Sequence, residues 1–469
     1  MNRRTAIIVL CLAALAALLS GPQSSTATQK PRYNVIVIAS DDLRATLGSY
    51  GNTIVKTPNL DKLAARGVRF ERAYTQYPLC NPSRSSLLTG KYPTQTDVLD
   101  NEHYFRALHP ELVSLPQHFK ANGYVSLRAG KIFHGGIDDT EAWTEGGEAR
   151  NFTSAKRPPS NADSAERIAH SDRIVVLEGN GENNDDYRMA TQAIEFLERY
   201  KDKPFFLALG MARPHSPPTA PKKFFDLYDA NKISLPVDFS TRPQAPAGFP
   251  EISIARRNTD LFINREATER DAREMIPAYY ASVSFMDEQV GRVLDAIDRL
   301  KLRDNTIILF WGDHGYHLGE KGKWSKAYSL FEVATRVPFI IAGPGVAKGV
   351  SPRTVQLLDM YPTLVDLCGL PQPYESPSRL EGHSLVSLLR NPRSRWDHPA
   401  FSVVQYQGKL GKSVRTERWH YVSWDEGRAG EMLLDLANDP NELKNLAADP
   451  AYARTVSEMR KLLTQIPAQ

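Results

Sequence analysis

The stretch YNVIVIASDD, residues 33–42, contains the pattern that decides the fold. Its first eight residues are mostly apolar and β-branched, which is typical of a strand buried on both faces of a parallel sheet. Asp41 and Asp42 follow at the carboxyl end of this predicted strand. A second run of the same kind, NTIILFWGDHG at 305–315, also leads into an acidic residue, Asp313. The sequence therefore predicts two buried strands that deliver carboxylates at their carboxyl ends.

Helical patterns alternate with strand patterns along most of the chain. Between residues 283 and 297, apolar side chains recur every three or four positions, as on one face of an amphipathic helix. Further helices are predicted at 58–66, 115–122, 187–201 and 357–367, and further strands at 124–127, 204–210 and 337–345. This alternation predicts an α/β fold in which a doubly wound, mostly parallel sheet is flanked by helices.

Doubly wound sheets bind ligands at the carboxyl ends of their strands, where the chain passes from strand to loop. The polar residues at these ends are therefore expected to converge in space. They are Asp41, Asp42, Asp313 and His314. Oxygen-rich sites of this kind suit calcium or magnesium. Taken singly, adjacent acids at a strand end are more often helix caps or solvated loop residues.

The first residues of the chain predict export. Arg3 and Arg4 precede an apolar run from Ala6 to Leu19, and small residues follow. This is the layout of a secretory signal peptide over residues 1–27, and the run is short for a membrane span. The alternative is an uncleaved N-terminal anchor. We expect an exported protein, periplasmic, extracellular or lumenal, without a stable membrane span in the mature chain.

The remaining sequence predicts two parts. Residues 28–375 carry the strand–helix alternation of the predicted catalytic α/β domain. Residues 139–185 and 236–270 within it are polar and are predicted to be surface insertions. Past 375 the alternation fades, and residues 376–469 predict a smaller C-terminal α+β subdomain with a short antiparallel sheet. Its strands are expected at 400–406, 412–417, 419–424 and 431–436, before a helix at 451–463.

Charge and cysteine content narrow the function classes. The chain has 58 Lys and Arg and 54 Asp and Glu, so its net charge is +4. This small charge does not indicate nucleic-acid binding, which needs clustered basic residues. Removal of the signal peptide leaves Cys80 and Cys368. One disulfide bridge is an alternative, but Cys368 lies in an apolar stretch, which favours a buried and inert thiol.

The most informative segment is LCNPSRSSLLTG, residues 79–90. Pro82 ends an extended approach and is predicted to open a helix at Ser83 or Arg84, which places Cys80 near a helix N-terminus that favours anions. Arg84 is predicted either to bind an oxyanion or to hold the Cys80 side chain. From Cys80 alone, a surface thiol in a turn would be the better interpretation.

The wider motif reverses that interpretation. Cys-x-Pro-Ser-Arg followed by Leu-Thr-Gly resembles the signature of type I sulfatases, in the alkaline-phosphatase-like superfamily. The resemblance implies that a formylglycine-generating maturation enzyme reads Pro82 and Arg84 and oxidises Cys80 to formylglycine. It also implies one Ca²⁺, with Mg²⁺ as the lesser alternative, bound by modified Cys80 and by four further ligands. These are Asp41, Asp42, Asp313 and His314. Many sulfatases have Asn at the last position, and His is the variant of iduronate-2-sulfatase-like enzymes.

Three short segments complete the predicted catalytic set. They are GKIFHG at 130–135, RPHSP at 213–217 and WSK at 324–326. The resemblance implies that four of their residues contact the formylglycine or the sulfate and act with Cys80 and Arg84. These four are Lys131, His134, His215 and Lys326; three of them, Lys131, His215 and Lys326, are also predicted to bind substrate. Arg213 is added as a candidate contact for a substrate carboxylate.

These motifs predict a hydrolase of sulfate esters on a sulfated carbohydrate, with a formylglycine hydrate as nucleophile. The 2-O-sulfate of a uronic acid is the expected target, as in iduronate-2-sulfatase-like enzymes. A phosphatase or phosphonate hydrolase on the same scaffold is one alternative, although Cys-x-Pro-Ser-Arg speaks against it. Another is an inactive glycan-binding relative, which the loss of Cys80 or of a metal ligand would favour. None is missing.

Overall fold

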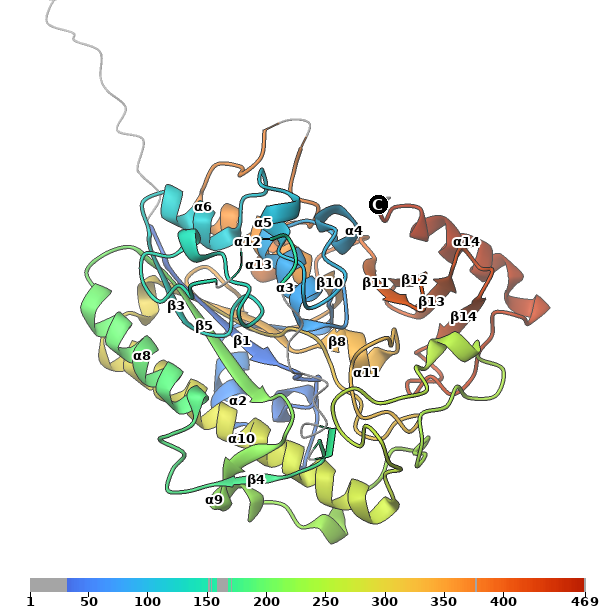
Figure 1. Ribbon diagram of the computed structural model, residues 1–469. Coiled ribbons are helices and arrows are strands. Elements are labelled where there is room, and N and C mark those ends of the chain that lie inside the picture. Colours follow the sequence, from blue (N-terminus) through green and yellow to red (C-terminus); the bar gives the residue numbers. More distant parts are fainter. Residues whose placement is uncertain are drawn as a thin grey trace, which may run out of the picture. The chain divides into compact units, whose positions relative to one another are not determined.

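A sheet of eight strands forms the centre of the computed structural model (Figure 1). The structure describes residues 32–150, 152, 154–157, 168–169, 171–375 and 378–467. The signal peptide predicted over residues 1–27 lies outside these residues. The strands run in the order β10-β2-β9-β7-β1-β5-β3, with β8 beside β2. Their bounds are Asn34–Asp41 (β1), Val68–Tyr74 (β2), Val125–Gly130 (β3), Phe205–Pro214 (β5), Thr306–Gly312 (β7), Arg336–Val337 (β8), Phe339–Ala342 (β9) and Gly349–Gln356 (β10).

Strand directions confirm the predicted fold class. The central strand β1 pairs in parallel with β5 and β7, and β3 pairs in parallel with β5. The β9 strand, predicted from VPFIIAGPG, runs antiparallel to both of its neighbours, β7 and β2. Because β1, β5 and β7 run the same way, their carboxyl ends meet at one edge of the sheet.

The side chains of β1 alternate between two cores because successive residues of a strand face opposite sides. Val35 and Val37 pack in the core under α3, α6 and α12, and Ile36 and Ile38 pack in the core under α2, α8 and α10. Figure 1 shows these two groups of helices on opposite faces of the sheet. Their bounds are Pro58–Ala64 (α2), Cys80–Thr89 (α3), Leu115–Ala121 (α6), Asp185–Tyr200 (α8), Glu269–Arg299 (α10) and Met360–Cys368 (α12).

The starts of α10 and α3 can each be explained from the local sequence. Thr268 caps α10 by accepting a hydrogen bond from the amide of Asp271, and the Asp271 side chain accepts one from the amide of Thr268. The helix after Leu79 begins at Cys80 itself, earlier than the predicted start at Ser83 or Arg84. Pro82 is tolerated there because the first turn of a helix has no intrahelical use for its amide groups.

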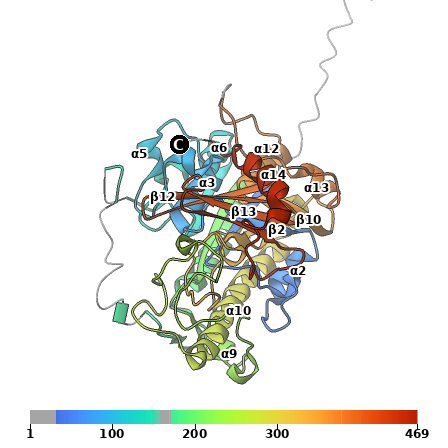
Figure 2. The ribbon, with the colours of Figure 1, turned by 90° about the vertical axis from the view of Figure 1, so that its right-hand side faces the viewer.

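The C-terminal subdomain is a four-stranded antiparallel sheet in the order β11-β12-β13-β14, with α14 packed on β12 and β13 (Figure 2). The bounds are Ala400–Tyr406 (β11), Lys409–Arg415 (β12), Trp419–Trp424 (β13), Gly430–Asp435 (β14) and Ala453–Leu463 (α14). Its β11 strand contacts β2 of the large sheet, and the amide of Val403 donates to the carbonyl of Gln76, two residues past β2, at 2.8 Å. This confirms the predicted short antiparallel sheet.

The remaining elements are short. They are Pro93–Thr96 (α4), Phe105–Leu108 (α5), Lys222–Phe225 (α9), Glu332–Thr335 (α11), Val386–Arg390 (α13) and the paired strands Val175–Leu177 (β4) and Thr219–Pro221 (β6). Cys368 is buried with a free thiol, as predicted. Within the described residues, no helix combines the length and apolar character needed to cross a membrane.

Substitution of Gly210 in β5 tests how tightly this strand is packed against the segment after β3. A Cβ at this position would overlap the carbonyl group of Lys131. We expect Gly210→Ala to lower the free energy of unfolding by about 3 kcal/mol, because backbone atoms cannot move aside cheaply. The control is Gly135→Ala, whose added Cβ meets no atom within 4 Å. Urea unfolding measures both, and equal stabilities would contradict this packing.

Candidate active site

The end of β1 presents two neighbouring carboxylates to the same site. Consecutive strand residues normally point to opposite faces. Here β1 ends at Asp41, and Asp42 takes a positive φ of 61°, which redirects its side chain. Tyr279 of α10 holds this turn, since its hydroxyl donates to the carbonyl of Asp42 at 2.6 Å and accepts from the amide of Arg44 at 3.2 Å.

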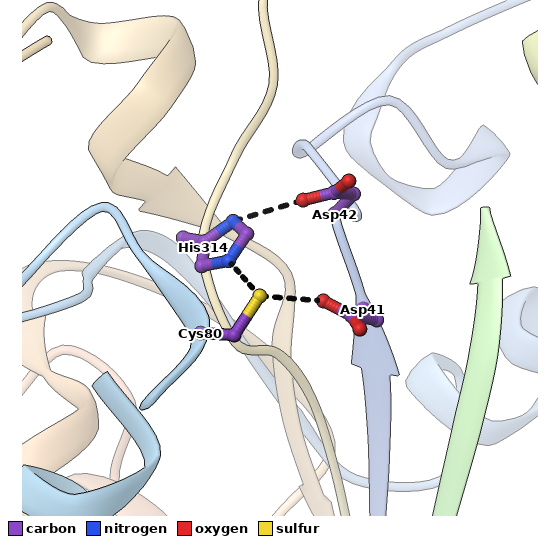
Figure 3. Close-up of side chains that lie close together, drawn as sticks. All are labelled: Asp41, Asp42, Cys80 and His314. Atoms are coloured by element: carbon purple, nitrogen blue, oxygen red, sulfur yellow. Dashed lines mark hydrogen bonds and ion pairs between the residues drawn. The ribbon is translucent and has the colours of Figure 1, made fainter. Parts of the chain in front are cut away.

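Cys80 lies between Asp41, the last residue of β1, and His314, which follows β7 (Figure 3). Its side chain is buried, with Sγ 3.4 Å from Asp41 Oδ1 and 3.3 Å from His314 Nε2. His314 Nδ1 donates to the carbonyl of Gly315 at 3.1 Å and lies 3.4 Å from Asp42 Oδ1. Because a carbonyl can only accept, the proton is on Nδ1 and the lone pair of Nε2 faces Cys80.

These four residues fit a divalent metal ion. One ligand atom from each of Asp41, Asp42, Cys80 and His314 lies within 4.8 Å of the others, and all four residues are buried. An imidazole that donates its other nitrogen to a carbonyl is oriented as metal-ligating histidines are. Burial, despite the nearby ammonium of Lys326, raises the pKa of Asp42 well above its usual range. The raised pKa means that the nearby cations do not fully balance the charge of Asp42, so the site can bind a further positive charge.

Asp313, predicted as a metal ligand, lies next to this group. Its Oδ2 accepts from Arg84 Nε at 2.8 Å, and its Oδ1 accepts from the amides of Asp42 at 3.2 Å and His314 at 3.0 Å. Three donors of the chain itself therefore orient the carboxylate, and Oδ2 accepts only from Arg84. Its role as a metal ligand stays a prediction.

Arg84 is completely buried and connects three segments of the site. Besides Asp313, its Nη1 donates to the carbonyls of Lys131 at 2.6 Å and Ile132 at 2.9 Å, and its Nη2 lies 4.0 Å from Asp41 Oδ1. A planar guanidinium suits this task because it has five donors in fixed directions. The side chain therefore positions the α3 N-terminus against β7 and the segment after β3.

Two lysines reach the same carboxylates from other segments. Lys131 Nζ pairs with Asp41 Oδ2, and Lys326 Nζ lies 2.9 Å from Asp42 Oδ1. Burial alone would raise the pKa of Asp41, but Lys131 and the other nearby cations outweigh it and hold that pKa well below its usual range. Lys326 also lies 3.3 Å from Asp260 Oδ2. The site is thus a buried network of opposite charges.

The histidines of the predicted set border this network and are neutral. His215 Nδ1 donates to the carbonyl of Ser216 at 2.8 Å, and its Nε2 lies 3.9 Å from Asp42 Oδ2. Burial first, and then the charge of Lys326, lower the pKa of His215 to about 3. Burial and Lys131 also lower the pKa of His134, whose Nδ1 has no hydrogen-bond partner in the described part of the chain.

Arg213 is turned toward its own loop. Its Nη1 donates to the carbonyls of His215 and Pro217, both at 2.9 Å, and to Thr219 Oγ1 at 3.1 Å. The side chain therefore braces the loop that carries His215. Its predicted contact with a substrate carboxylate remains a prediction.

Two residues of the site were missed by the sequence analysis. Tyr279 lies on the amphipathic helix, where an aromatic residue indicates only a core position. Asp260 lies in the polar segment that was predicted to be a surface insertion, yet it is only 8% exposed. No local motif marks either residue.

The fold and this buried acidic centre define a member of the alkaline-phosphatase-like superfamily. A model described as "Sulfatase" matches residues 33–370, and one described as "N-sulphoglucosamine sulphohydrolase, C-terminal" matches residues 319–469. The chain belongs to the sulfatase family and is a sulfuric ester hydrolase.

Individual relatives cover most of the chain. A sulfatase of Formosa agariphila is 34% identical over 460 residues, 93% of this chain and 87% of that protein. Human iduronate 2-sulfatase is 32% identical over 516 aligned residues, 92% of each chain. Among solved structures, a 2-O GAG sulfatase superposes with a TM-score of 0.66 at 26% identity, covering 92% of this chain and 91% of the other.

Metal binding predicts a stability change that depends on Asp42. After dialysis against a chelator, CaCl₂ at a hundred times its Kd should stabilise the native protein by about 2.7 kcal/mol at pH 7, since an ion that binds only the folded state adds its binding energy. Thermal unfolding with and without the ion measures this. Asp42→Asn should lose the response. Asp185→Asn, at a carboxylate 71% exposed, should keep it. Equal responses in the two variants would contradict the site.

Proposed function

We propose that this protein hydrolyses 2-O-sulfate esters of uronic acid units in a sulfated glycan, with formylglycine derived from Cys80 as the nucleophile. The observation that carries the proposal is the position of Cys80, at the first residue of α3 and between Asp41 and His314. The names of two relatives support the substrate, namely human iduronate 2-sulfatase and the 2-O GAG sulfatase.

Burial determines when the modification can take place. Cys80 is 1% exposed and Arg84 is completely buried. A maturation enzyme that reads Cys80, Pro82 and Arg84 cannot reach these side chains in the folded protein. We therefore expect conversion of Cys80 to precede folding of α3 onto the sheet.

The chain's own charges prepare the site for a sulfate ester. Such esters are poor electrophiles because negative oxygens surround the sulfur, so the site has to neutralise charge. Lys131 and Lys326 reach the carboxylates beside residue 80 from separate segments, which supports them as the proposed contacts of the sulfate oxygens. A divalent cation held by Asp41, Asp42 and His314 would lower the pKa of a hydroxyl on residue 80 and balance further sulfate charge.

The proposed reaction has two steps. One hydroxyl of the hydrated aldehyde gives its proton to Asp313, which Arg84 orients, and its oxygen bonds to sulfur while the bond from sulfur to the sugar oxygen breaks. In the second step the other hydroxyl gives its proton to the neutral imidazole of His134, the carbon–oxygen double bond forms again, and the bond from that carbon to the sulfate oxygen breaks, so that sulfate leaves. A thiol or a serine has no second hydroxyl for this step.

His215 is the proposed acid for the departing sugar oxygen. With the pKa lowered to about 3, its imidazole is neutral in the ligand-free site, with the proton on Nδ1. It has to gain a proton on Nε2 before it can donate one. The negative charge of a bound sulfate ester favours that protonation, because it opposes the effect of Lys326.

The modification of Cys80 is directly measurable. Mass spectrometry of the tryptic peptide Ala73–Arg84 from active protein should show the thiol replaced by an aldehyde. Fully active protein that retains the thiol would overturn the mechanism. Cys80→Ala should abolish hydrolysis of sulfate esters while near-UV circular dichroism stays native. Phosphate esters assayed in parallel separate this proposal from a phosphatase or phosphonate hydrolase on the same scaffold.

The acid role of His215 predicts a dependence on the leaving group. His215→Ala should lower kcat for hydrolysis of a sulfated disaccharide by about 10²- to 10⁴-fold, the usual contribution of an acid catalyst. The same variant should lower kcat for hydrolysis of nitrophenyl sulfate much less, because nitrophenolate leaves without a proton. The comparison is made in kcat at saturating substrate. Equal losses on both substrates would remove the acid role.

A further inference from the structure

A basic pocket lies in the segment between α9 and α10, which includes residues 236–268. Its volume is about 410 Å³, and its walls contain four arginines and one glutamate. The lining residues that matter below are Arg242, Arg256, Arg257, Asn258, Arg265 and Glu266. In Figure 1 this yellow-green segment passes beside the end of the sheet where β1 and β5 terminate.

The wall of this pocket contacts the segment that carries Lys326 of the catalytic site. Asn258 Oδ1 accepts a hydrogen bond from the amide of Trp324 at 2.8 Å, and two residues later Asp260 Oδ2 lies 3.3 Å from Lys326 Nζ. The ring of Phe262, another lining residue, is 5.0 Å from that of Trp324. The segment that holds Lys326 therefore also forms the pocket.

The four arginines differ in how far their charge is already balanced. Arg242 pairs with Glu266, and Arg265 pairs with Asp271 at 2.9 Å and with Asp172. These two guanidinium groups hold the walls of the pocket together.

Arg256 and Arg257 have unused donors. Arg256 has a single ion pair, with Glu251 at 3.5 Å, and both side chains are about four-fifths exposed, so this pair is weak. The Arg257 side chain makes no hydrogen bond or ion pair with any residue that the structure describes. Two guanidinium forks are thus available on the segment whose Asp260 pairs with Lys326 of the site, and such forks match the oxygens of a sulfate or carboxylate.

We propose that Arg256 and Arg257 form an anion-binding subsite, which binds a sulfate or carboxylate on a sugar unit next to the one whose sulfate is removed. The inference rests on the proposed function, because the ligand is the same sulfated glycan extended by its neighbouring units. A polymer with an anion on each unit presents these groups at regular spacing, so the reacting sulfate and a neighbouring anion can be bound together. The enzyme then favours multiply sulfated chains over isolated sulfate esters.

Binding tests this subsite without requiring turnover. The probe is a heparin-derived hexasaccharide, titrated calorimetrically into Cys80→Ala protein at low salt. We expect Arg256→Gln/Arg257→Gln to raise the Kd at least tenfold and to make it less dependent on salt, because two screened charge contacts are lost. The matched control is Arg395→Gln/Arg454→Gln, two side chains 88% and 91% exposed with acidic partners of their own. The control should bind as the parent does.

Kinetics with mature protein separates the subsite from the function itself. The Arg256/Arg257 variant should lose at least ten times more kcat/KM on a multiply sulfated hexasaccharide than on nitrophenyl sulfate, with the loss in KM. Equal losses on both substrates, or equal Kd values for the variant and control pairs, would overturn the subsite and leave the hydrolase intact. Parent protein that hydrolyses no sulfate ester would instead overturn the proposed function.

Discussion

The structure depends on the balance of charge around residue 80. Four carboxylates and three cations meet at a largely buried site, where an unbalanced charge is costly. The carboxylates are those of Asp41, Asp42, Asp260 and Asp313, and the cations are Arg84, Lys131 and Lys326. With all of these groups ionised, the net charge is negative. A bound divalent ion would make the net charge of the site positive. A site with that charge is suited to a sulfate ester, whose charge hinders attack on sulfur.

This balance explains why the fold is needed. The charges come from β1, β7, the α3 N-terminus and the segments after β3 and before α10, and no two neighbouring elements could supply them alone. Arg84 illustrates the point, since one buried guanidinium bonds to Asp313 and to the carbonyls of Lys131 and Ile132. The parallel sheet provides the common edge at which these distant segments meet.

The sequence predicted those parts that have a local physical signature. The apolar runs before Asp41 and Asp313 identified β1 and β7, and the rule for parallel sheets placed their polar ends together. The β2 strand was missed because charged residues interrupt its apolar pattern; Arg69 and Glu71 pair on its less buried face. Tyr279 and Asp260 were missed for another reason, since their contacts join positions distant in sequence and no motif marks them.

Side-chain direction was the other limit. The motif RPHSP identified the loop that carries Arg213 and His215. Only the structure shows that the guanidinium of Arg213 is turned toward this loop. Likewise, the turn at Asp42 depends on a positive φ, which two adjacent aspartates in the sequence do not predict. The signal peptide, the export of the protein and the roles of individual site residues stay predictions.

A crystal structure of mature protein grown with Ca²⁺ tests the central claim most directly. The account predicts an anomalous-scattering peak at the edge of β1, bound by Asp41, Asp42 and His314, with calcium–oxygen distances of about 2.3–2.6 Å, and a modified residue 80 facing the ion. A centre in which no ion is bound and residue 80 keeps its thiol would contradict it.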